Sequence, residues 1–342
     1  MKYRNLGSTG VKVSPLCLGT MMFGAWGNTD HEDSIRIIHS TLDAGINFVD
    51  TADMYSAGES EEITGKALAG RRDKVILATK VHGPMSFDPN EQGNSRRWII
   101  QECENSLRRL GTDYLDLYQI HRPDEGVDID ETLGALSDLL HQGKIRAFGS
   151  STFPAEQIVE AQWVAEKRGR ERFRTEQPPY SLLVRGIERD VLPTCLSYGM
   201  GVISWSPLAG GWLSGAFGAG KQNTSRRSAR LPARYDLSLP GNQKKLEVVG
   251  ELETVAHDAG LTLIELALAF VLEHPAISAA IIGPRTMEHL ESQLGAADIV
   301  LDEAVLERID AIVAPGTNLN FDDAGWIPAA LTKSNLRRRH YR

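Results

Sequence analysis

Cysteine is scarce in this sequence, and so are long apolar stretches. The three cysteines, Cys17, Cys103 and Cys195, stand far apart in a chain of 342 residues, without a CxxC pair or a Cys/His cluster. Such spacing offers neither a disulfide framework nor a zinc site, and it fits a reducing compartment. No apolar run is long enough to cross a bilayer, and the N-terminal stretch is too polar for a signal peptide. These absences predict a soluble, cytoplasmic protein.

A surplus of positive charge is also missing. Asp and Glu number 45 against 37 Lys and Arg, which gives a formal net charge of −8, whereas a nucleic-acid binder needs a basic surface to neutralise phosphates. Small anionic ligands stay open, because they need only a local positive site. We expect a small-molecule substrate, no nucleic-acid or membrane partner and no bound metal. The sequence does not indicate an oligomeric state.

What the chain does have is one repeating pattern: a short apolar run, a polar or glycine-containing turn, and a longer amphipathic segment. Buried parallel strands read as short, continuous apolar runs. The runs expected as strands are 16–20, 47–51, 75–80, 114–121, 147–151, 173–177, 201–205 and 278–283. Apolar residues at helical spacing fill the intervening segments, several of which end in glycine as helices do, including 34–45, 95–111, 131–144 and 154–169.

Eight such alternations without a long linker predict an α/β fold, a single (β/α)8 barrel. A doubly wound open sheet is the alternative, and it is disfavoured because no GxGxxG follows an early strand. All of residues 1–342 are expected to form one domain. Its parts are a β-hairpin at 1–14 that plugs the barrel bottom, the barrel at 15–300, a long loop at 214–240, and a C-terminal extension at 301–342 that begins with a helix.

In a barrel of this kind, chemistry gathers at the C-terminal ends of the strands. The chain carries mostly polar or aromatic residues there, namely Asp50, Lys80, His121, Ser151, Thr152, Gln177, Trp205, Ser206, Gly283 and Arg285. Tyr55 follows Asp50 by five residues, on the loop above it. These side chains are expected to converge at one mouth of the barrel.

The segments that carry these residues resemble the aldo-keto reductase family. GINFVDTADMYSAGESEEITGKAL at 45–68 is similar to the first family signature with its DTAxxY core, and SLRRLGTDYLDLYQIHRPD at 106–124 is similar to the second. WSPLAGGWLSG at 205–215 and IIGPRTMEHLESQLGA at 281–296 resemble the cofactor-binding segments. The motifs occur in family order, which is a highly specific pattern. The resemblance implies NADPH-dependent reduction of aldehyde or ketone carbonyls to alcohols.

Four residues carry the catalysis that this resemblance implies. Tyr55 is the general acid that protonates the alkoxide left by hydride addition. Lys80 makes the phenol proton more available by stabilising the phenolate, and Asp50 pairs with Lys80 and orients it. His121 hydrogen-bonds the carbonyl oxygen.

The resemblance also implies contacts with NADPH or NADP⁺. Ser151, Thr152 and Gln177 hold the nicotinamide amide, and Trp205 stacks on its ring. Arg285 binds the 2′-phosphate that distinguishes NADP from NAD. The other residues implied are Gly19, Thr20, Met21, Asp50, Ser206, Pro207, Leu208, Gly210, Gly283, His289 and Gln293, with backbone amides from Ser206 onward facing the pyrophosphate.

Two other functions stay open at this point. The same resemblance extends to channel-associated β subunits, which bind NADPH while acting mainly as regulatory partners. A barrel isomerase or aldolase with Lys80 as a Schiff-base amine is the second alternative. For a reductase, Trp26, Trp212 and Tyr55 suggest aromatic pocket walls, and no second arginine is clearly aimed at the substrate. Small or aromatic aldehydes are therefore expected to be reduced better than ketoacids or sugar phosphates.

Overall fold

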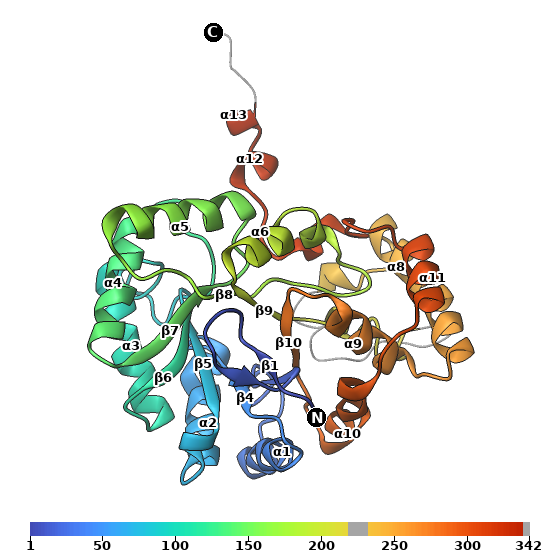
Figure 1. The fold of residues 1–342 in the computed structure, drawn as a ribbon, viewed down its shortest axis with the longest axis horizontal. Coiled ribbons are helices and arrows are strands. Elements are labelled where there is room, and N and C mark those ends of the chain that lie inside the picture. The colour runs from blue at the N-terminus through green and yellow to red at the C-terminus, as the bar shows by residue number, and fades with distance from the viewer. Residues whose placement is uncertain (218–231, 338–342) are drawn as a thin grey trace.

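A computed structural model describes residues 1–217 and 232–337, and its centre is a closed barrel of eight parallel strands (Figure 1). The strands are β3 (Leu16–Gly19), β4 (Phe48–Asp50), β5 (Ile76–Val81), β6 (Leu115–Ile120), β7 (Ile145–Ser150), β8 (Thr175–Glu176), β9 (Gly201–Ser204) and β10 (Ile277–Ile282). β10 closes the barrel by pairing with both β9 and β3. Each predicted apolar run overlaps one strand, and the predicted (β/α)8 fold is confirmed.

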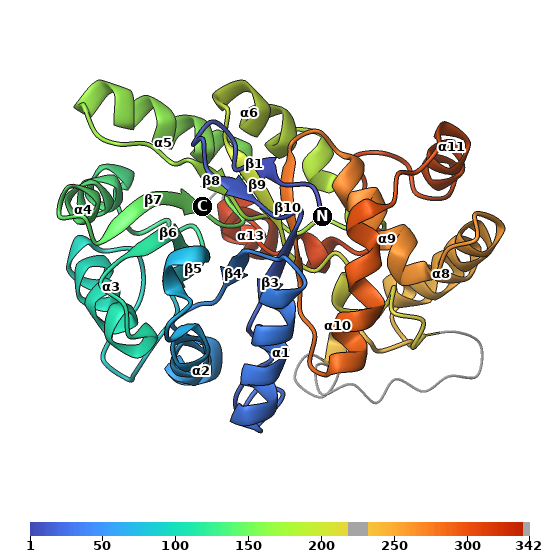
Figure 2. The same cartoon turned by 60° about the horizontal axis from the view of Figure 1, so that its bottom comes forward.

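Helices cover the outside of the barrel (Figure 2). They are α1 (His31–Asp43), α2 (Glu59–Leu68), α3 (Arg96–Leu110), α4 (Ile129–His141), α5 (Ala155–Arg168), α6 (Val191–Tyr198), α8 (Pro240–Asp258), α9 (Leu263–Glu273), α10 (Met287–Leu294) and α11 (Glu303–Ile312). Two short helices, α12 (Ala329–Thr332) and α13 (Ser334–Arg337), follow α11 and do not belong to this layer. Local chemistry sets their ends. The Ser95 hydroxyl caps the start of α3 by accepting from the Trp98 backbone N–H, and Gly111 ends it with φ +62°.

Side chains alternate across each strand, so one set faces the helices and the other fills the barrel. The outward set belongs to the large core between strands and helices. The inward set in the lower barrel includes Phe48, Leu117 and Ile203, and it continues into Leu6 and Val13 of the N-terminal hairpin. That hairpin, β1 (Arg4–Asn5) paired antiparallel with β2 (Lys12–Val13), therefore closes the barrel bottom as predicted.

The chain beyond α11 returns to the open end of the barrel. Asn318 forms a bridge with Val184, and Asp323 is ion-paired with the buried Lys245 of α8. Gly325, with φ +82°, lies so close to Trp205 that a Cβ on it would stand 2.7 Å from the Trp205 ring. α12 and α13 then project away from the barrel (Figure 1).

The loop predicted at 214–240 follows β9 and ends where α8 begins, while its residues 218–231 lie outside the described residues. Among the described residues, no single helix is long and apolar enough to cross a membrane. Within residues 1–217 and 232–337, one pair of helices, α8 and α9, meets those criteria of length and composition together, and the two are bent by 90° relative to each other.

Candidate active site

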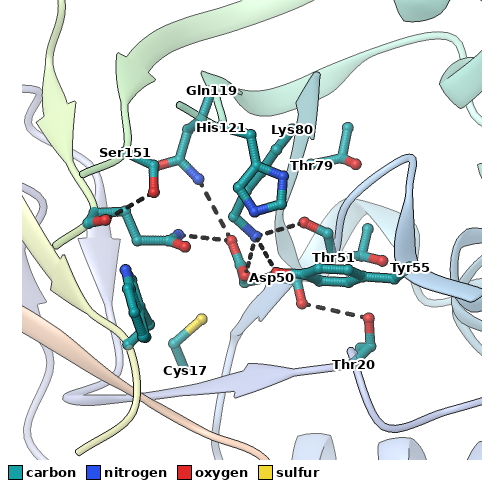
Figure 3. Close-up of polar contacts among 12 residues, drawn as sticks. Cys17, Thr20, Asp50, Thr51, Tyr55, Thr79, Lys80, Gln119, His121 and Ser151 are labelled. Atoms are coloured by element: carbon teal, nitrogen blue, oxygen red, sulfur yellow. Dashed lines mark hydrogen bonds and ion pairs between the residues drawn. The ribbon is translucent and has the colours of Figure 1, made fainter. Parts of the chain in front are cut away.

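A buried ion pair forms the centre of the site, where β4 and β5 end. The Lys80 ammonium donates to Asp50 Oδ2 at 2.6 Å and to the Thr51 carbonyl at 2.7 Å (Figure 3). Neither side chain is more than 3% exposed. Burial on its own would lower the pKa of Lys80, but Asp50 and Tyr55 outweigh it and hold that pKa above its ordinary value. The pair is therefore charged, which satisfies both groups inside the barrel.

Tyr55 faces this pair from the short turn that follows β4. Its hydroxyl lies 3.2 Å from Lys80 Nζ. The turn is tight, because Ser56, Ala57 and Gly58 all have positive φ, at 50°, 56° and 95°. A Cβ on Gly58 would stand 2.8 Å from Arg109, which is itself ion-paired with two buried carboxylates. Only glycine fits there, so the turn is held against the barrel and the Tyr55 hydroxyl is held over Lys80.

His121 completes the group at the end of β6. Its ring meets Tyr55 edge to face, with 5.8 Å between the centroids. Burial, together with the charges of Lys80 and Arg122, holds the pKa of His121 well below its usual 6.5. The imidazole is therefore neutral at physiological pH and carries a single N–H donor. Its Nδ1 atom is buried and has no hydrogen-bond partner among the described residues.

Two amides line the layer beneath. Gln177 donates from Nε2 to Asp50 Oδ1 at 2.8 Å, and Gln119 donates to the same oxygen at 3.4 Å. Both therefore fix the carboxylate that orients Lys80. Gln177 is one of the predicted residues, whereas Gln119 is not. The sequence could have indicated Gln119, because side chains alternate along a strand. Gln119 precedes His121 by two residues and therefore faces the same side of β6.

The predicted nicotinamide residues form one connected patch beside the ion pair. Ser151 donates to the Gln177 carbonyl at 2.8 Å, and Trp205 Nε1 lies 3.4 Å from the Thr152 hydroxyl. Thr152 takes φ +61°, an uncommon backbone conformation for a β-branched residue. Strain of this kind gathers at functional sites, where the surrounding structure fixes the residue. The hydroxyls and the indole ring thus share one wall of the mouth.

The chain beyond Trp205 turns sharply through the predicted Ser206, Pro207, Leu208 and Gly210, with φ +56° at Ser206 and +71° at Gly210. A small cavity of about 20 Å³ opens beside this turn. Arg234 and Tyr235 line it as well, and the Tyr235 hydroxyl donates to the Gly210 carbonyl at 2.8 Å. The strand-end rule does not find these two residues, because they belong to a loop.

The residues predicted at the adenosine end lie around the start of α10. Arg285 and His289 are neighbours there, since burial and the Arg285 charge together lower the pKa of His289. Gly283 is exposed, and a Cβ on it would meet no atom within 4 Å. Gln293 differs from the others: it is buried, and its amide donates to the His289 carbonyl one turn earlier.

The remaining predicted residues follow β3. A Cβ on Gly19 would stand 2.5 Å from the Ile281 side chain, so glycine is required where these strands meet. Thr20 is fully buried and shares a hydrogen bond of 2.9 Å with Ser60. Met21 is half-buried beside it. Two tryptophans are expected from the sequence to line the substrate pocket. The ring centre of Trp26 lies 6.0 Å from that of Tyr55, whereas Trp212 is buried and its ring stacks on Phe217.

Arg122 reaches the site although the strand pattern does not single it out. Its Nη1 donates to the His121 carbonyl, and its guanidinium carbon lies 5.8 Å from the centre of the Trp205 ring. Burial lowers the pKa of Arg122, while Tyr55 and Glu176 are close enough to oppose that shift. A second arginine therefore stands at the mouth, at a position that the sequence pattern alone does not single out.

Known proteins match this chain over nearly its whole length. Residues 15–314 match the model of the Aldo/keto reductase family. Uncharacterized oxidoreductase YrpG of Bacillus subtilis (strain 168) is 43% identical over 329 residues, which cover 92% of this chain and 97% of that protein. Aldo-keto reductase YhdN of the same organism is 37% identical over 297 residues, covering 85% and 87%. "Probable voltage-gated potassium channel subunit beta" of Arabidopsis thaliana is 34% identical over 325 residues, covering 92% and 97%.

Proposed function

The chain belongs to the aldo/keto reductase family and is therefore an oxidoreductase, and from this premise we propose that it reduces aldehyde or ketone groups to alcohols with NADPH. One observation carries the proposal. The Tyr55 hydroxyl stands 3.2 Å from the ammonium of Lys80, which is itself fixed by the buried Asp50. The hydroxyl can give its proton to the substrate oxygen while the ammonium beside it balances the negative charge left on the ring, so Tyr55 suits the role of proton donor.

The neutral state of His121 supports this division of roles. A group whose pKa is held well below 6.5 is not protonated near neutral pH and cannot serve there as the cationic acid. It can donate its one N–H to the substrate carbonyl oxygen and orient it toward the Tyr55 hydroxyl. The proton then leaves Tyr55 Oη for the alkoxide oxygen, and the ammonium of Lys80 stabilises the phenolate that remains.

The surrounding residues fit a nicotinamide dinucleotide, and the family generally uses NAD(P)H. When bound, NADPH supplies the hydride. Trp205, Ser151 and Thr152 offer an aromatic face and hydroxyls for the nicotinamide ring and amide. We assign the pyrophosphate to the turn from Ser206 to Gly210, whose positive φ values at Ser206 and Gly210 are typical of anion-binding backbone turns. Gly283, two residues before Arg285, borders open space, since a Cβ on it would meet no atom within 4 Å.

A preference for NADPH over NADH is part of the proposal. Arg285 carries it, because a guanidinium matches the fork of a phosphate monoester, and His289 beside it extends the same surface. We further propose a cytoplasmic location, which fits three free, buried cysteines, and a small carbonyl compound as the partner.

A regulatory role is the second candidate, because one relative carries the name of a potassium channel subunit. The two roles differ in turnover. A reductase consumes NADPH continuously when a carbonyl is supplied, whereas a sensor holds NADPH and consumes almost none.

The test is NADPH oxidation measured with the full chain across a panel of aldehydes, ketones and sugars, with NADH in parallel. Multiple turnovers that depend on the carbonyl support the reductase. Tight NADPH binding with less than one turnover across the whole panel refutes it and favours the regulatory role. Borohydride trapping of a substrate on Lys80 would instead point to Schiff-base chemistry.

A further inference from the structure

We infer that Arg122 forms a subsite that binds an anionic group of the substrate next to the reacting carbonyl. The preferred substrates are therefore aldehydes or ketones that carry a carboxylate or a phosphate. This inference rests on the proposed reductase function and names its substrate class. It reverses the expectation from the sequence that neutral aldehydes are preferred.

The position of Arg122 is the first argument. It follows His121 directly, and one of its nitrogens is hydrogen-bonded to the His121 carbonyl. Its guanidinium carbon lies 5.8 Å from the centre of the Trp205 ring. The cation therefore lies close both to His121, whose ring faces Tyr55, and to the Trp205 ring. Its charge also acts on His121 and on Tyr55, so the guanidinium lies near the two groups assigned to the substrate carbonyl.

The unbalanced charge of Arg122 is the second argument. Within the described residues it has no carboxylate within ion-pairing distance and donates a single hydrogen bond. The residues outside the described ranges, 218–231 and 338–342, contain no Asp or Glu. A guanidinium has five N–H donors, so most of them are available to a ligand.

Glu176 does not supply the missing charge. This carboxyl is buried, and it accepts hydrogen bonds from the Ser150 hydroxyl and the Phe153 backbone N–H. Burial raises the pKa of Glu176 to about 7, so it is only partly ionised near neutral pH. Arg234, the other cation whose charge acts on Arg122, is itself 3.9 Å from Asp323. The mouth is thus locally positive on a protein whose formal net charge is −8.

An unpaired, half-buried cation is costly unless a ligand completes it. A guanidinium holds carboxylates and phosphates through two parallel hydrogen bonds, which gives both affinity and orientation. Trp26, whose ring centre lies 6.0 Å from that of Tyr55, supplies an aromatic wall for the rest of the substrate. A substrate anchored at its anionic end would be oriented with its carbonyl toward Tyr55.

The experiment compares matched pairs of substrates that differ in one charged group. The pairs are 4-carboxybenzaldehyde with 4-methylbenzaldehyde, 4-oxobutanoate with butanal, and glyceraldehyde 3-phosphate with glyceraldehyde. The ratio of kcat/KM within each pair is measured for the unmodified protein and for Arg122→Gln, Arg122→Lys and Arg97→Gln. Arg97 is an exposed arginine on α3, so its variant matches the loss of one charge outside the site.

The unmodified protein is expected to favour the anionic member of at least one pair by about 10- to 100-fold, the scale of a charge-assisted hydrogen bond. Arg122→Gln should remove that preference, Arg122→Lys should keep part of it, and Arg97→Gln should leave it intact. Each ratio compares two substrates on the same variant. A loss of activity that a displaced His121 causes for both substrates therefore does not change the ratio. The aromatic, aliphatic and phosphate pairs together distinguish a carboxylate from a phosphate as the group recognised.

A ratio that Arg122→Gln leaves unchanged overturns the inference. So does a variant that loses NADPH affinity while keeping its substrate preference, since Arg122 would then serve the cofactor. If no carbonyl compound is reduced at all, the proposed function fails. The subsite is then tested separately, by measuring the binding of terephthalate and of inorganic phosphate by calorimetry. Binding of either anion that Arg122→Gln abolishes supports the subsite, and binding that the variant retains, or no binding at all, refutes it.

Discussion

Replacing Lys80 by methionine is expected to destabilise the fold by about 3–5 kcal/mol, because it leaves Asp50 buried without its counter-charge. The Asp50 carboxylate would lose the ammonium at 2.6 Å and keep only the amide donors of Gln177 at 2.8 Å and Gln119 at 3.4 Å. Two neutral amides do not replace a full positive charge in the barrel interior. Asp50→Asn should carry a similar cost, since it leaves the ammonium of Lys80 with only the Thr51 carbonyl and the Tyr55 hydroxyl.

The double variant Lys80→Met/Asp50→Asn removes both charges and keeps both side-chain volumes close to the original. Buried ion pairs replaced in this way usually leave stability unchanged or raise it. The double variant should therefore be more stable than either single variant and stay inactive, which separates the catalytic role of the pair from its effect on folding.

The assay is urea unfolding followed by tryptophan fluorescence and by circular dichroism, with agreement between the two probes as the condition for a two-state fit. The reasoning is refuted if both single variants unfold within about 1 kcal/mol of the unmodified protein, since a buried, unpaired charge costs several times more. The reasoning is also refuted if the double variant loses as much unfolding free energy as the two single variants lose together.

Arg285→Ala should reduce the preference for NADPH over NADH by about 1.5–3 kcal/mol, because it removes a charge-assisted contact with the 2′-phosphate. The preference is measured as the ratio of the two dissociation constants. Equal affinities for the two nucleotides in the unmodified protein would contradict this role of Arg285. Glu176→Gln should gain stability relative to the unmodified protein by about 3 kcal/mol as the pH rises from 4.5 to 7. Burial raises the pKa of Glu176 from 4.5 to about 7, so between these pH values the carboxyl ionises in the unfolded chain but stays protonated in the folded one. The stability of the unmodified protein therefore falls as the pH rises. Parallel curves of unfolding free energy against pH for the two proteins would contradict this prediction.

Much of the site follows from the backbone rules of a parallel barrel and is predictable from the sequence. Asp50, Lys80 and His121 each lie within one residue of a strand end, and in a parallel barrel these ends must meet at one mouth. Tyr55 is different, because it lies on a turn with three consecutive positive φ values, and only the DTAxxY motif indicates it. The turn also packs closely on Arg109, a residue far from Gly58 in the sequence.

The residues that the sequence did not indicate share a physical reason. Arg122 lies one residue beyond His121, where the strand period no longer fixes which way a side chain points. Arg234 and Tyr235 lie within the predicted 214–240 loop, but tertiary contacts decide which residues of a loop reach the mouth. Gly325 meets Trp205 across more than a hundred residues of chain, and no local pattern contains that contact.

The most direct test of the proposal is the rate of hydride transfer in Tyr55→Phe, measured by stopped flow in a single turnover with an aldehyde. The substitution keeps the ring and removes only the hydroxyl 3.2 Å from Lys80 Nζ. The rate should fall by about 10²- to 10⁴-fold, the usual contribution of a positioned acid. NADPH affinity, measured by fluorescence titration, should barely change.

Adding Lys80→Met to Tyr55→Phe should cause little further loss, because both residues act on one proton transfer. His121→Phe belongs in the same series as the next candidate acid. A Tyr55→Phe variant that transfers hydride at a near-normal rate would contradict the central claim that Tyr55 donates the proton.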